Sequence, residues 1–135
     1  MPASPAPVQL YLRAKDKPLF AVYHPTRSES DPRMQPGAAV LMLGAWGAED
    51  MSSHRGWRGL AQSLAERGCP VLRVDWDGCG DSSDLPDGAD HWQAWQTSVG
   101  DAIHALQGLS GVRQVTLVGL RLGALLAATA CVARK

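Results

Sequence analysis

The sequence has no excess of either charge and no cysteine pattern. Its 135 residues carry 13 basic and 13 acidic side chains, so no electrostatic feature predicts a nucleic acid or an anionic membrane surface as a partner. The three cysteines, Cys69, Cys79 and Cys131, form no C-x-x-C pair and are odd in number. Because residues 1–7 also contain no apolar signal segment, we expect a reduced, cytoplasmic protein.

Motifs for cofactors and metals are missing as well. The glycine-rich stretch 78–84 has no third glycine of a dinucleotide fingerprint, and the phosphate-binding pattern G-x-x-x-x-G-K-[ST] does not occur. No spacing of His, Cys and Asp indicates a metal site. We therefore expect no cofactor and no metal, in a chain whose length allows at most one domain.

Residues 115–133 form an apolar stretch with a single charge, Arg121. An arginine at the centre of a membrane-spanning helix costs about 2.5–3.5 kcal/mol, and two glycines interrupt the stretch, so we expect no membrane span. Instead, residues 115–118 have the composition of a strand buried on both faces. A turn at 119–123 and an Ala- and Leu-rich helix would follow.

Apolar runs alternate with amphipathic helical segments along the rest of the chain. This alternation predicts an α/β fold with a mostly parallel sheet flanked by helices, whereas a flavodoxin-like or nucleotide-binding domain would be the competing fold. The second helix is expected to begin at a capping box, Asp90 with Gln93, and to end near Gly108. Strands are predicted at 8–12 and 19–23, as an antiparallel hairpin, and at 38–43, 70–75 and 115–118, each of the last three followed by a helix.

Ligands of such sheets bind beyond the carboxyl ends of the strands. Loops 44–50, 76–84 and 119–123 should meet there and form the site. Three of the four histidines are expected elsewhere. We predict that His24 lies on a surface loop and that His91 and His104 are solvated or capping residues on or beside the second helix.

Residues in these loops resemble α/β-hydrolase motifs. Asp75–Ser82 resembles the D-x-x-G-x-G-x-S loop after the fourth strand, Gly119–Gly123 lies where the G-x-S-x-G elbow belongs, and residues 45–47 where the oxyanion-hole loop belongs. More narrowly, residues 49–55, 71–75 and 118–123 are similar to a serine-aminopeptidase-like subgroup that includes exosortase A system-associated hydrolases.

The resemblance implies an α/β-hydrolase-like fold, of which only the N-terminal strands and helices are present, and ester or amide hydrolysis as the family chemistry. Residues 1–18 would be an extended N-terminal segment with the first strand. Residues 19–135 would be the N-terminal part of the hydrolase-like domain.

Arg121 stands where this resemblance places the nucleophilic serine. Arginine has no nucleophilic oxygen and cannot form an acyl-enzyme, and no Asp, Glu or His follows Gly123 to complete a triad. We therefore expect that the chain is not catalytic by itself. The oxyanion donors implied by the resemblance are the backbone N–H groups of Leu122 and of Trp46 or Ala45.

A non-catalytic binding module is the alternative. Arg121 would grip a carboxylate or another anion, with the Leu122 amide assisting. Glu49 could pair with Arg121, although we favour a role for this acid in the first turn of a helix. Cys79 and Ser82 would line the site as a small buried thiol and a turn-forming hydroxyl rather than as nucleophiles. A plain packing turn, with Arg121 pointing to solvent, is the alternative to this clamp. A third possible function is a docking module, in which the apolar last helix and the stripe of Trp92 and Trp95 bind another chain.

The predicted last helix is apolar around most of its circumference, and the last strand presents an edge. We therefore expect these surfaces to be covered, either by a homodimer partner or by a missing C-terminal half. The other expected partner is a small-molecule substrate or anion.

Overall fold

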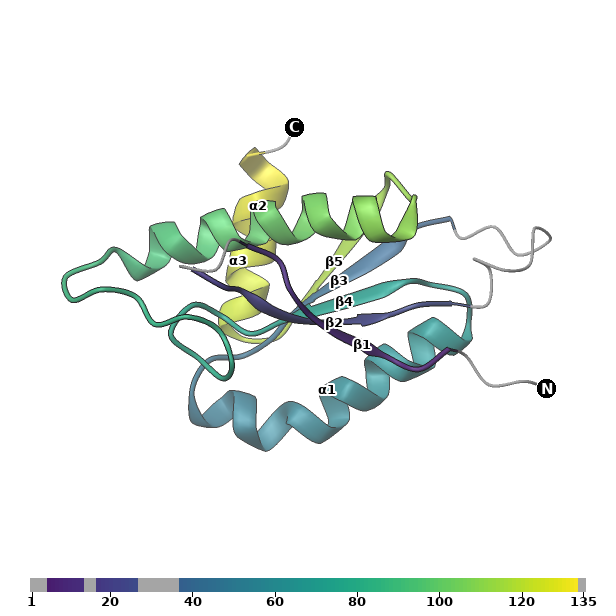
Figure 1. Ribbon diagram of the computed structural model, residues 1–135, viewed down its shortest axis with the longest axis horizontal. Helices are drawn as coiled ribbons and strands as arrows, with labels where there is room; N and C mark the ends of the chain where they lie inside the picture. The colour runs from purple at the N-terminus through teal and green to yellow at the C-terminus, as the bar shows by residue number, and fades with distance from the viewer. Residues whose placement is uncertain (1–4, 14–16, 27–36, 134–135) are drawn as a thin grey trace.

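The computed structural model describes residues 5–13, 17–26 and 37–133. A sheet in the order β1-β2-β4-β3-β5 has α1 on one face and α2 and α3 on the other (Figure 1). The predicted order of strands and helices is confirmed. The elements are β1 (Val8–Tyr11), β2 (Phe20–His24), β3 (Ala39–Leu43), α1 (Ala48–Glu66), β4 (Val71–Val74), α2 (His91–Ser110), β5 (Val115–Gly119) and α3 (Leu122–Ala133).

The sheet is mixed. Strand β3 pairs in parallel with β4 on one side and with β5 on the other, as the alternation of strands and helices predicts. The β1–β2 hairpin is antiparallel, also as predicted, and β2 runs antiparallel to β4. The carboxyl ends of β3, β4 and β5 therefore lie at the same edge of the sheet.

Strand β3 is fully buried at the centre, because helices cover both of its faces. The larger core cluster lies between the sheet and α2 and α3, and it includes Leu41, Leu72 and Leu106. A smaller cluster around Met42 lies beneath α1. Strand β5 is not buried on both faces, contrary to our prediction, because it lies at the edge of the sheet and its residues are half-buried or exposed.

Two helix ends test the predicted boundaries. The Asp90 carboxylate accepts a hydrogen bond from the Gln93 backbone N–H at 3.0 Å, as expected for the start of α2. The helix continues past Gly108 to Ser110, because the left-handed residue that ends it is Gly111, with φ 72°. Within the described ranges, no helix combines the length and the apolar character needed to cross a membrane.

Candidate functional site

Three loops meet at the carboxyl edge of the sheet, as the sequence predicts. The indole N–H of Trp76 donates to the Gly44 carbonyl oxygen at 2.9 Å and so joins the loop after β4 to the loop after β3. The Trp46 ring packs against Trp95, with 6.2 Å between the ring centroids. The turn after β5 is tied to the same place, since the Leu120 N–H donates to the Leu43 carbonyl oxygen at 2.9 Å.

The turn between β5 and α3 is tight and is specified by two glycines. A Cβ atom on Gly119 would overlap the backbone of Ala124, and one on Gly123 would overlap the carbonyl group of Leu43. Strand and helix can therefore approach closely only with glycine at both positions. Between them, Arg121 has φ 57°, a left-handed conformation that costs a non-glycine residue about 1–3 kcal/mol.

The Arg121 side chain extends into solvent at the tip of this turn. It is 72% exposed, and its Nε lies 3.8 Å from Oε2 of Glu49, which is 57% exposed. The pairing of Glu49 with Arg121, which we considered less favoured than a role for Glu49 in the first turn of a helix, is therefore present. An exposed pair of this kind contributes only about 0–1 kcal/mol, so the guanidinium stays available to another anion.

Backbone donors flank Arg121. The N–H of Leu122, the first residue of α3, has no acceptor among the described residues, and neither has the N–H of Trp46. An uncompensated N–H at the start of a helix favours a negatively charged group. The side chain of Trp46 is half exposed, whereas Ala45 is buried.

The loop after β4 is held by its own hydrogen bonds. Asp75 Oδ2 accepts from the Asp81 N–H at 3.0 Å, and Gly80, with φ 52°, passes so close that a Cβ atom would overlap this carboxylate. Ser82 Oγ donates to the Asp75 carbonyl oxygen at 2.6 Å and accepts from the Phe20 N–H at 2.9 Å. Ser82 thus joins β2 to the end of β4, while Cys79 is half-buried against the larger core cluster.

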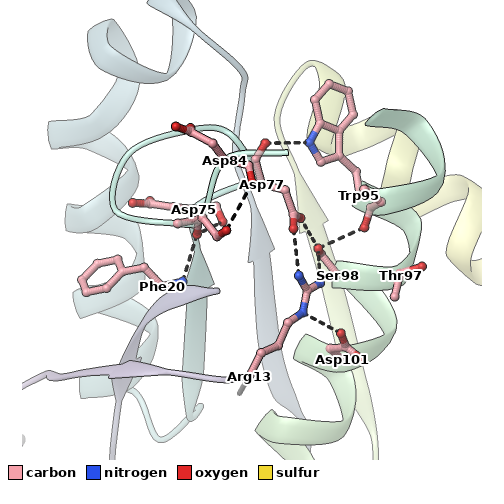
Figure 2. Close-up of polar contacts among 12 residues, drawn as sticks. Arg13, Phe20, Asp75, Asp77, Asp84, Trp95, Thr97, Ser98 and Asp101 are labelled. Carbon is pink, nitrogen blue, oxygen red and sulfur yellow. Dashed lines mark hydrogen bonds and ion pairs between the residues drawn. The ribbon is translucent and has the colours of Figure 1, made fainter. Parts of the chain in front are cut away.

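A charged cluster behind this loop was not predicted from the sequence. Arg13 donates from Nη1 to Asp77 at 2.8 Å and from Nε to Asp101 at 2.9 Å, and it also donates to Ser98 (Figure 2). Ser98 in turn donates to Asp77. Trp95 adds a hydrogen bond to the Asp77 carbonyl oxygen at 3.1 Å, so the cluster ties the end of β1 and the loop to α2.

Burial by itself would lower the pKa of Arg13. The hydrogen bonds and charges of Asp77 and Asp101 outweigh burial, so that the pKa is raised and the guanidinium stays charged. Of the histidines, His91 and His104 are exposed as expected. The prediction for His24 is wrong: it is the last residue of β2 and is 1% exposed, because α1 packs over the face of the strand that carries it.

Known proteins resemble this arrangement in sequence and in fold. Residues 38–133 match the model of the α/β hydrolase fold family. Among curated proteins, none matches the chain in sequence.

Three solved structures illustrate the likeness in fold. Est1E from Butyrivibrio proteoclasticus, determined with ferulic acid bound, has a TM-score of 0.71 and 19% identity over 90% of this chain and 46% of its own. The thioesterase domain from the curacin biosynthetic pathway has a TM-score of 0.73 and 20% identity over 96% of this chain and 41% of its own. A lidless α/β serine hydrolase from Xanthomonas campestris has a TM-score of 0.68 and 20% identity over 98% of this chain and 59% of its own.

The chain thus spans about half the length of the solved structures that it resembles, between 41% and 59% of these three. At such identities the structural likeness supports the fold alone. The family match is independent of it and covers more than half of the chain. This chain therefore belongs to the α/β hydrolase fold family.

Proposed function

We propose that the loops at the carboxyl edge of the sheet form a hydrolase-type binding site in which Arg121 replaces the nucleophile and binds a carboxylate or similar anion. The observation that carries the proposal is the position of Arg121. It lies at the tip of a strand–turn–helix junction in a left-handed conformation, with an exposed guanidinium. Next to it is the Leu122 N–H, for which the described part of the chain offers no acceptor. A planar guanidinium grips a carboxylate with two parallel hydrogen bonds.

The same position argues against acyl transfer by this chain. Arginine offers no oxygen for covalent attack. The hydroxyl of Ser82, which is buried in the loop after β4, is already hydrogen-bonded to the backbone of Asp75 and of Phe20. The backbone N–H groups of Leu122 and Trp46 would serve the bound anion rather than a tetrahedral intermediate. This assignment is consistent with the serine-aminopeptidase-like, exosortase-associated subgroup that residues 118–123 resemble, which we propose as the narrower family.

Two measurements test this function. A fluorophosphonate probe should leave every serine of the chain unlabelled, and labelling at any serine would favour a hydrolase. Titration with acetate, followed by NMR, should shift the amide signals of Leu122 and Gly123. Arg121→Ala should abolish these shifts, whereas Arg113→Ala, which removes an exposed arginine elsewhere, should preserve them.

A partner-docking module is the second candidate, and the surface of α3 favours it. Leu125 is 58% exposed and Val132 is 71% exposed, and both lie on a helix that follows the edge strand β5. We propose that another polypeptide segment covers this face, either a second copy or the C-terminal half of a hydrolase domain. In this view residues 1–18 form the N-terminal segment with the first strand, and 19–135 the N-terminal part of that domain.

Two substitutions distinguish the anion-binding function from the docking function. Leu125→Asp should abolish self-association in sedimentation experiments and leave the acetate shifts unchanged. Arg121→Ala should do the reverse. If Leu125→Asp has no effect on the sedimentation of the chain, the second-copy version of the docking proposal is lost.

A further inference from the structure

A cavity lies on the face of the sheet that α1 covers, opposite to α2 and α3. It has a volume of about 760 Å³ and runs between α1 and strands β2 and β4, and Arg121 is not among its lining residues. Gly59 of α1 forms part of its wall. Apart from its chain neighbours and the adjacent helix backbone, no described atom lies within 4 Å of the position that a Cβ atom on Gly59 would take, so this stretch of α1 leaves the groove open.

The groove has an excess of positive charge. Arg55 and Arg58 line it from α1 and Arg73 lines it from β4, against the carboxylates of Asp75 and Asp81. Three guanidinium groups facing two carboxylates leave one positive charge. One carboxylate neutralises this charge, whereas the second negative charge of a doubly charged anion would lose its hydration without a counter-charge. Arg58 makes no side-chain hydrogen bond to the described part of the chain, so its donors are available.

His24 adds a buried donor to the same groove. Its Nε2 accepts a hydrogen bond from Arg73 Nε at 3.0 Å, so in the neutral ring the proton is on Nδ1. Among the described residues, this Nδ1 has no hydrogen-bond partner, although His24 is 1% exposed. A buried donor of this kind is uncommon in folded proteins and calls for an acceptor.

The protonation state of His24 is fixed by its surroundings. Burial, followed by the charges of Arg73 and Arg58, lowers the pKa of the ring, and the nearby Gln62 side chain, which also lines the groove, partly opposes them. The ring is therefore neutral at neutral pH and presents an N–H without adding a charge. An anion can accept from this N–H while it pairs with the guanidinium of Arg58.

We propose that this groove is a second binding site, for an amphipathic carboxylate whose oxygens are held by Arg58 and by His24 Nδ1–H. The wall also includes Phe20 and Val22 of β2 and Trp57 of α1, which would cover an aromatic or short aliphatic group. The site is independent of the one at Arg121, since it uses other side chains on the other face of the sheet.

Benzoate is a suitable probe, with benzyl alcohol as its uncharged counterpart and phenyl phosphate as its doubly charged one. Binding should be followed by NMR on the Arg121→Ala protein, so that the carboxyl-edge site contributes nothing. Benzoate should shift amide signals in β2 and in residues 55–62 of α1. Benzyl alcohol should shift none of them, and phenyl phosphate should bind more weakly than benzoate.

Arg58→Gln should weaken benzoate binding at least tenfold, and Arg113→Gln, the matched control, should not change it. His24→Gln should weaken benzoate binding as well. Because His24 is buried, an unperturbed amide spectrum of α2 serves as the control that this variant still folds. The proposal is overturned if benzoate leaves residues 55–62 unshifted or if Arg58→Gln binds as the parent does. Tighter binding of phenyl phosphate would overturn the choice of a singly charged ligand.

Discussion

The backbone at Gly123 lies directly against the carbonyl group of Leu43, so that any Cβ atom at position 123 would overlap it. Because the neighbour is backbone in the central strand, it cannot move aside. We expect Gly123→Ala to lower the free energy of unfolding by about 3 kcal/mol or more, measured by urea denaturation. Gly108→Ala is the control. Its Cβ would meet nothing within 4 Å, and alanine should stabilise α2 by about 0.5–1 kcal/mol.

The Arg13 cluster should be a major contributor to stability. The side chain of Asp77 is 5% exposed and that of Arg13 is 17% exposed, so removing the arginine leaves a buried carboxylate without its counter-charge. We expect Arg13→Met to cost about 3 kcal/mol in urea denaturation. Arg113→Met, at an exposed position, should change stability by no more than about 0.5 kcal/mol. Equal effects of the two substitutions would contradict the role of the cluster.

His24 should make the stability of the protein depend on pH. Its pKa is lowered in the folded state from the ordinary 6.5 by burial and by Arg73 and Arg58. Below about pH 6.5 the unfolded chain therefore binds a proton that the folded chain does not, and stability falls as pH decreases towards the folded-state pKa. The difference in unfolding free energy between the parent and His24→Gln should shrink between pH 7.5 and pH 5. A difference that is constant over this range would show that His24 does not titrate as described.

Glu49 should compete with ligands for Arg121 while adding little to stability. Their side-chain atoms are 3.8 Å apart and both groups are largely exposed. Glu49→Gln is expected to change the unfolding free energy by less than about 1 kcal/mol and to strengthen acetate binding by up to about fivefold. Unchanged affinity would indicate that the pair has no part in the site.

Much of the carboxyl-edge site follows from the sequence, because apolar runs and helical segments in alternation place the ends of parallel strands at one edge. The glycines around Arg121 predict the tight turn for the same reason that the structure needs them: strand and helix backbones touch there. How far β5 is buried could not be predicted from its composition. A run of Val and Leu has the same composition whether one face is covered or both.

The Arg13 cluster and the buried His24–Arg73 pair could not be predicted from the sequence, for a different reason. Arg13 meets Asp77 and Asp101 across 64 and 88 residues, and nothing local in the sequence marks such a meeting. His24 precedes a proline and a polar segment, which indicates a loop. Its burial depends on β2 pairing with β4 rather than with the next strand in the chain, so that His24 faces Arg73 beneath α1.

The most direct test of the account is acetate titration of the parent chain and of Arg121→Ala, followed at the Leu122 and Gly123 amides, with a parallel fluorophosphonate reaction. We predict saturable shifts that vanish in Arg121→Ala, and no labelled serine in either protein. Shifts that persist without the arginine, or a covalently labelled serine, would contradict an anion clamp at the nucleophile position.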